Sequence, residues 1–120
     1  MRVSATRAGD VTVVTAVGDI DIATSEHLRE CLDAVVDRHE HHIVLDLTRV
    51  LFVDSTFLGV LVGTRNRLQP VDGRISVVCP HPPVVKIFRM TGLDQVFTLH
   101  ATLEDVLRRS TPVALGEDPR

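Results

Sequence analysis

The sequence predicts an α/β domain with a mixed, mostly parallel sheet of four to five strands and about four helices. Two observations carry this prediction. Short runs rich in Val and Ile alternate with longer runs in which apolar residues recur every three or four positions. The first two strand-like runs are adjacent, whereas each later one follows a helix-like run. Such a run supplies the crossover that parallel pairing requires.

The amino-terminal half divides into a hairpin, a helix and a third strand. Strands are predicted over residues 3–8 and 11–17, joined by the turn signal Gly9-Asp10. A helix is predicted from about Thr24, because five apolar side chains between residues 28 and 36 follow helical spacing. The next strand is predicted over residues 43–47, which form a short apolar run.

The carboxyl-terminal half continues this alternation. A helix is predicted over residues 55–68, with its inward face formed by Leu58, Leu61, Val62 and Leu68. The remaining elements follow in order: a turn at 70–73, a strand over 74–79, a short helix from Pro83 to a left-handed cap at Gly92, a last strand over 96–99, and a helix starting at 102–105. Residues 1–110 are predicted to form one domain, and residues 111–120 a flexible tail.

Composition excludes several classes of function. The chain has 120 residues, a formal net charge of −3 and no Trp or Tyr. It has no strongly basic run, so direct nucleic-acid binding is not expected. No apolar stretch approaches the roughly 20 residues of a membrane span, and the amino terminus lacks a secretory signal, so we expect a cytoplasmic protein. The two cysteines, Cys31 and Cys79, match no metal or redox spacing and are predicted to be buried free thiols.

Neither a metal centre nor a catalytic site is expected. His39, His41 and His42 lie between a helix and a strand without a cysteine partner, which is typical of a solvated loop. Ser55 lacks the flanking glycines of a hydrolase nucleophile elbow, and the chain has no nucleotide-binding fingerprint. We therefore predict a binding protein with no cofactor and no catalytic residues.

The segment Asp54-Ser55-Thr56 is the strongest candidate site. It separates an apolar strand from a helix, and all three residue types are good helix N-caps. Free backbone N–H groups and the positive end of the helix dipole would make a phosphate on a hydroxyl there favourable. Two readings remain open at this point: a plain helix cap, and a modification site at Ser55 or, as second choice, Thr56.

Three segments together resemble the STAS domain family in its single-domain form, the bacterial anti-sigma factor antagonist. They are residues 18–21 (Gly-Asp-Ile-Asp), residues 52–61 around Asp54-Ser55-Thr56, and residues 83–93. The likeness covers about residues 8–108. It implies a STAS fold and a protein that binds an anti-sigma factor with serine kinase activity, thereby releasing a sigma factor for transcription.

The resemblance also implies a phosphorylation switch. In this family the kinase uses ATP to phosphorylate the first hydroxyl after the Asp, and a phosphatase restores binding. Carried over to this sequence, the acceptor is Ser55, and Asp21 matches a loop Asp near the acceptor. Both Asp21 and Asp54 could instead serve as helix caps. The expected partner-binding residues are Asp21, Asp54, Ser55, Thr56, Phe57 and Val60.

Phe57 departs from the family pattern, which has Gly at this position. Helical spacing places it one residue off the expected core stripe, so we predict a solvent-facing pair of Phe57 and Val60 beside the acceptor. The alternative is that Phe57 packs between the helix and the sheet. The departure slightly favours a second function, a STAS adaptor or scaffold in a stress-signalling or lipid-transport complex without a phosphorylation switch.

Overall fold

The computed structural model describes residues 2–110, with the side chains of residues 2–108. Its elements alternate as the sequence predicts. The strands are β1 Arg2–Ala8, β2 Val11–Val17, β3 His42–Arg49, β4 Arg74–Val78 and β5 Thr98–His100. The helices are α1 Ile22–Asp37, α2 Ser55–Leu68, α3 Pro82–Met90 and α4 Leu103–Ser110, with short 3-10 turns η1 Gln69–Val71 and η2 Leu93–Gln95. The expected tail, residues 111–120, lies outside the described residues.

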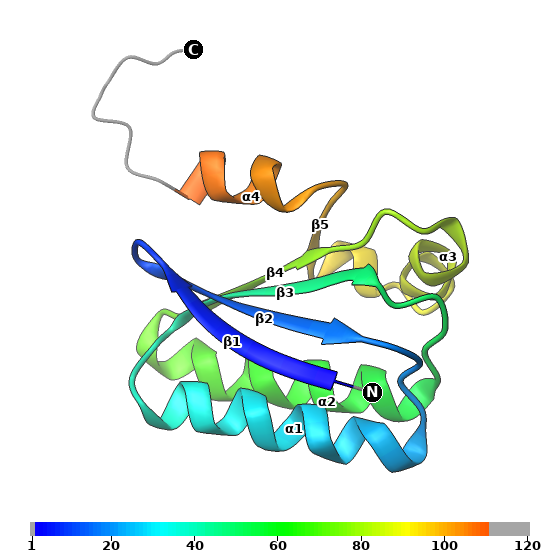
Figure 1. Ribbon diagram of the computed structural model, residues 1–120, viewed down its shortest axis with the longest axis horizontal. Coiled ribbons are helices and arrows are strands. Elements are labelled where there is room, and N and C mark those ends of the chain that lie inside the picture. Colours follow the sequence, from blue (N-terminus) through cyan, green and yellow to red (C-terminus); the bar gives the residue numbers. More distant parts are fainter. Residues whose placement is uncertain (1, 111–120) are drawn as a thin grey trace.

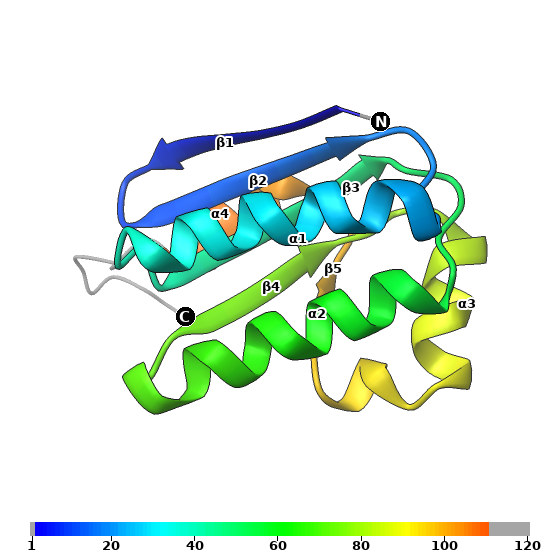
Figure 2. The ribbon, with the colours of Figure 1, turned by 90° about the horizontal axis from the view of Figure 1, so that it is seen from below.

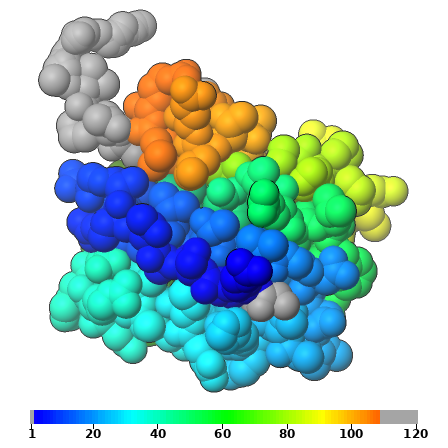
Figure 3. Space-filling view, in the orientation of Figure 1, coloured from blue at the N-terminus to red at the C-terminus, as the bar shows by residue number. Residues whose placement is uncertain are grey.

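The sheet has the mixed, mostly parallel topology that was predicted. The strand order is β1-β2-β3-β4-β5, in which β1 pairs antiparallel with β2 and all later pairs are parallel. Helices α1 and α2 lie side by side on one face, and α4 lies on the other (Figures 1 and 2). In the space-filling view β1 runs exposed across the molecule between α1 and α4 (Figure 3).

Alternation along the strands produces two separate cores. On β3, the side chains of Ile43, Leu45 and Leu47 point into the main core beneath α1 and α2. Val44 points the other way, into a second core that α4 covers with Val106. Successive side chains of a strand face opposite sides of the sheet, so one apolar run can serve both cores. Apart from Asp46, the residues at positions 43–47 of β3 are apolar, which is typical of a strand covered on both faces.

Several boundaries and one burial state differ from the sequence prediction. Strand β3 is longer than the predicted 43–47, and one end each of β1, β4 and α3 differs by a single residue. Helix α1 begins at Ile22 rather than Thr24, because Asp21 caps it. The last strand lies at Thr98–His100 rather than residues 96–99, because the Val96 and Phe97 N–H groups still donate to the Leu93 carbonyl of η2, at 3.0 and 2.9 Å. Cys31 is only half-buried, whereas Cys79 is buried, and both thiols are free. The left-handed conformation expected at Gly92 is confirmed, with φ +77°.

Candidate functional site

The predicted start of α2 is confirmed, and Asp54 is its N-cap. Asp54 has extended backbone geometry, and its Oδ1 accepts a hydrogen bond from the Thr56 backbone N–H at 2.9 Å. The Thr56 hydroxyl donates to the same carboxylate oxygen. One aspartate therefore satisfies a free helix donor and also holds the neighbouring hydroxyl.

The two candidate hydroxyls lie in different environments. Ser55 is the first residue of α2 and is exposed. Among residues 2–108, whose side chains the structure describes, its hydroxyl has no hydrogen-bond partner. Thr56 is half-buried, and its hydroxyl is committed to Asp54. Of the two residues, Ser55 has the accessible hydroxyl.

The connection between β2 and α1 runs alongside the connection between β3 and α2. Ile20 and Val53 form a parallel bridge. The Ile20 N–H donates to the Phe52 carbonyl at 2.9 Å, and the Asp54 N–H donates to the Ile20 carbonyl at 3.1 Å. These bonds bring residue 21 beside residue 54. The starts of α1 and α2 therefore lie together, at the carboxyl ends of the parallel strands β2 and β3 (Figure 2).

Asp21 is likewise the N-cap of its helix, α1, but it forms a reciprocal capping box with Thr24. Its Oδ1 accepts from the Thr24 backbone N–H at 3.0 Å, while Thr24 Oγ1 accepts from the Asp21 N–H at 2.9 Å. The Thr24 N–H, and then the Thr24 hydroxyl, hold the pKa of the Asp21 carboxyl below its ordinary value of 3.8. Asp21 therefore stays ionised at neutral pH, on the exposed surface near Ser55.

The prediction that Phe57 faces solvent is wrong. Its side chain is 0% exposed and packs edge-to-face on Phe88 of α3, with ring centroids 6.2 Å apart. The buried face of α2 consists of Phe57, Leu61, Thr64 and Leu68, whereas Leu58 and Val62 are only half-buried. Val60 is also half-buried and packs against the main core. The predicted Phe57–Val60 contact surface does not exist.

A different apolar surface lies beside Ser55, and sequence reasoning missed it. Leu51 and Phe52, in the connection from β3 to α2, are 64% and 50% exposed, and Ile22, the first residue of α1, is 74% exposed. The signal in the sequence was that Leu51-Phe52 interrupts a connection where polar residues are usual. We call these three side chains the apolar rim. Their exposure beside a hydroxyl and two helix starts suits contact with another protein.

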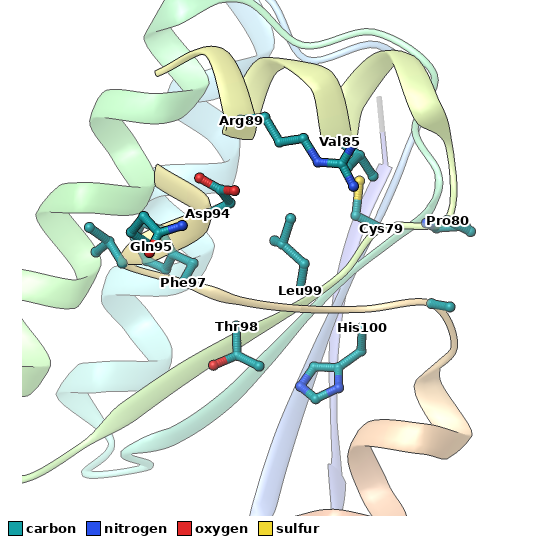
Figure 4. Close-up of a pocket in the computed structure, with 12 residues that line it drawn as sticks. Cys79, Pro80, Val85, Arg89, Asp94, Gln95, Phe97, Thr98, Leu99 and His100 are labelled. Atoms are coloured by element: carbon teal, nitrogen blue, oxygen red, sulfur yellow. The ribbon is translucent and has the colours of Figure 1, made fainter. Parts of the chain in front are cut away.

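A groove along β5 and a pair of histidine rings are two further features of the surface, and neither includes residues of the Ser55 region. A groove of about 530 Å³ lies along β5, between Arg89 of α3 and Asp94 of η2, with Leu99 pointing into it (Figure 4). His39 and His41 stack edge-to-face, with ring centroids 6.0 Å apart. In the described part of the chain, no group of three or more His, Cys, Asp or Glu side chains is placed to hold a metal ion.

No membrane-spanning helix is found within residues 2–110: none of the helices there is both long enough and apolar enough to cross a bilayer.

Comparison with known proteins agrees with the geometry. The family model of the STAS domain matches residues 2–106. An anti-sigma F factor antagonist from Paenibacillus polymyxa is 32% identical over 91 residues, which are 75% of this chain and 78% of that protein. The anti-sigma-F factor antagonist RsfB of Mycobacterium tuberculosis is 33% identical over 98 residues, 81% of this chain and 79% of that one.

A solved structure extends the likeness to three dimensions. The crystal structure of an anti-sigma factor antagonist from Mycobacterium paratuberculosis superposes with a TM-score of 0.83 at 32% identity, covering 90% of this chain and 92% of that chain. Both relatives are named as antagonists of an anti-sigma factor, which agrees with the predicted class of regulatory binding protein. With the family model matching almost all of the described residues, the chain belongs to the STAS domain family.

Proposed function

We propose that this protein is a cytoplasmic anti-sigma factor antagonist. It binds an anti-sigma factor with serine kinase activity, thereby releasing a sigma factor, and phosphorylation of Ser55 ends the binding until a phosphatase removes the phosphate. The observation that carries the proposal is the exposed Ser55 hydroxyl at the start of α2, which has no hydrogen-bond partner among the residues whose side chains are described. The names of its relatives, which are anti-sigma factor antagonists, support the partner class.

The surroundings of Ser55 suit a switch based on charge. The apolar rim of Ile22, Leu51 and Phe52 is exposed and would lose its water on binding a partner. A phosphate adds about −1.5 to −2 charges at this place, next to the Asp54 and Asp21 carboxylates. Burying such a charge against an apolar surface is unfavourable, and an acidic group on the partner would be repelled. A loss of about 1.4 kcal/mol of binding free energy already weakens the complex tenfold.

The switch needs no unfolding of the domain. A negative group at the start of a helix is electrostatically favourable for the helix itself. The phosphate is therefore tolerated by α2 while it opposes the partner. Because Asp54 already accepts the Thr56 N–H, the phosphate would remain at the exposed first position rather than replace the cap.

The alternative function, an adaptor without a phosphorylation switch, loses its supporting observation. It was favoured by a bulky Phe57 standing where a partner would approach. Because that side chain is fully buried, it leaves access to Ser55 unchanged.

The proposal is tested by measuring binding to candidate anti-sigma kinases by calorimetry. We expect Ser55→Ala to bind about as well as wild type, and Ser55→Asp to bind at least tenfold more weakly. The matched control is Thr102→Asp, which adds the same charge at the start of α4, where Thr102 Oγ1 accepts from the Asp105 N–H at 3.1 Å. Because α4 lies on the other face of the sheet, this variant should bind normally. Equal binding by wild type and Ser55→Asp would refute the switch.

A further inference from the structure

Two adjacent hydroxyls at the start of α2 raise the question of which is modified. Ser55 and Thr56 are one residue apart, and a kinase that docks on this helix start meets both. Exposure alone separates them weakly, since Thr56 is half-buried rather than inaccessible. Their hydrogen bonds separate them more clearly, because Asp54 holds the Thr56 hydroxyl while the Ser55 hydroxyl has no hydrogen-bond partner within residues 2–108.

Phosphoryl transfer requires a hydroxyl that can move and lose its proton. The hydroxyl oxygen forms a bond to the γ-phosphorus of ATP. The bond from that phosphorus to the β–γ bridging oxygen breaks, and ADP leaves with the bridging oxygen. The hydroxyl proton passes to a base on the kinase. A hydroxyl that donates to a carboxylate has its proton already engaged in a charge-assisted bond.

Thr56 would have to break that bond and rotate before it reacts. Its Oγ1 and its backbone N–H both bond to Asp54 Oδ1, so the side chain is held against the cap by two neighbouring contacts. A β-branched side chain also has few χ1 alternatives in a helix. Ser55 meets neither obstacle.

We propose that Asp54 is a positioning residue that restricts phosphorylation to Ser55 by holding the hydroxyl of Thr56. The inference rests on the proposed function, and it assigns Asp54 a role beyond capping: it selects the acceptor. The same carboxylate oxygen has two roles: it caps α2 by accepting from the Thr56 N–H, and it keeps the second hydroxyl out of the reaction by accepting from the Thr56 O–H.

The test uses a background in which Thr56 is the remaining hydroxyl at the helix start. Purified Ser55→Ala is incubated with ATP and an anti-sigma kinase that modifies the wild type, and phosphate is located by peptide mass spectrometry. We expect Thr56 in Ser55→Ala to be modified at least tenfold more slowly than Ser55 in the wild type. Adding Asp54→Ala should raise the Thr56 rate at least tenfold.

Two further variants separate selection from a general loss of helix capping. Asp54→Asn retains a capping oxygen but replaces the charge-assisted bond with a weaker neutral one, so Thr56 modification should rise by a smaller factor. It also keeps the test valid if Asp54→Ala fails to fold. Thr102→Ala, in the same Ser55→Ala background, removes the cap of α4 instead and should leave the Thr56 rate unchanged.

Each outcome decides one of the two proposals. Phosphate that stays off Thr56 in both Asp54 variants, while the wild type is modified at Ser55, overturns the inference and leaves the proposed function standing. Equal rates at Thr56 in Ser55→Ala and at Ser55 in the wild type overturn it as well. A wild type that no anti-sigma kinase modifies at any residue refutes the phosphorylation switch and the inference with it.

Discussion

At the scale of single residues, Phe57 belongs to the packed core and not to a partner-binding surface. Its ring lies beneath α2 and contacts Phe88, which in turn contacts Phe97 with ring centroids 6.4 Å apart. Such edge-to-face pairs stabilise beyond the area they bury. A large side chain at this position therefore fills the core under the start of α2, where the family pattern has Gly.

We expect Phe57→Ala to lower the free energy of unfolding by about 3–5 kcal/mol, because it leaves a cavity beneath α2. Phe52→Ala is the matched control: its ring is 50% exposed, so stability should change by less than about 0.5 kcal/mol. Urea denaturation measures both. In binding assays at a temperature where both variants are folded, we expect the opposite ranking. Phe52→Ala should then weaken partner binding more than Phe57→Ala does. A stable Phe57→Ala would contradict the packing account.

The Asp21 carboxylate makes a prediction about pH. Its pKa is lowered chiefly by the Thr24 backbone N–H and next by the Thr24 hydroxyl. Because the folded value is below the unfolded one, the stabilisation is fully present above the ordinary value of 3.8 and is lost as pH falls through the folded value. An NMR titration should place the Asp21 midpoint below 3.8, and Thr24→Val, which keeps the N–H, should raise it. An unchanged midpoint in that variant would argue against the hydroxyl contribution.

At the scale of elements, the connection from β2 to α1 depends on Gly18. This residue has φ +107°, which side-chain-bearing residues rarely adopt, and its N–H donates to the Arg49 carbonyl at 3.1 Å. The turn directs residues 19–21 along the end of β3, so that Asp21 arrives beside the start of α2. A backbone conformation in one loop therefore positions a side chain of the candidate site.

Gly18→Ala should destabilise the domain by roughly 1–3 kcal/mol through backbone strain. Gly63→Ala provides the opposite control, because Gly63 is an exposed position inside α2 where an added methyl group would meet open space. It should stabilise the domain by about 0.5–1 kcal/mol. Thermal unfolding of the two variants would show shifts of opposite sign, and shifts of the same sign would contradict this explanation.

At the scale of the whole molecule, the sheet separates the site from α4. The main core joins the sheet to α1, α2 and α3, whereas the second core joins it to α4 through Val11, Val13, Val44, Val78 and Val106. The starts of α1 and α2 belong to the first layer. Stability that α4 contributes can therefore change without altering the surface around Ser55.

We expect Val106→Ala to cost about 2 kcal/mol of unfolding free energy, because Val106 is 1% exposed and the change removes buried methyl groups. Arg108→Ala, at a side chain that is 70% exposed, should have little effect. Partner binding below the unfolding transition should be the same for both variants and wild type. Weaker binding by folded Val106→Ala would show that the two layers are coupled.

Local sequence sufficed for the order of elements and for the start of α2, since hydrophobic period and capping chemistry act within a few residues. The inward face of α2 could not be predicted in the same way. Five of the six residues from 57 to 62 are apolar, so several helical phases fit equally well. Packing against the sheet, α1 and α3 selects Phe57, Leu61, Thr64 and Leu68, and buried Thr64 is satisfied by donating to the Val60 carbonyl at 3.0 Å.

By itself the sequence determined an α/β domain with a mostly parallel sheet and a helix that begins at Ser55 after a capping aspartate. These features depend on periodicity and on hydrogen bonds between near neighbours. Tertiary structure decided the rest: that Phe57 is buried, that Ile22, Leu51 and Phe52 form the apolar rim, and that Asp21 lies beside the start of α2. Each of these depends on contacts between segments that are distant in the sequence, and such contacts cannot be predicted from a local sequence pattern.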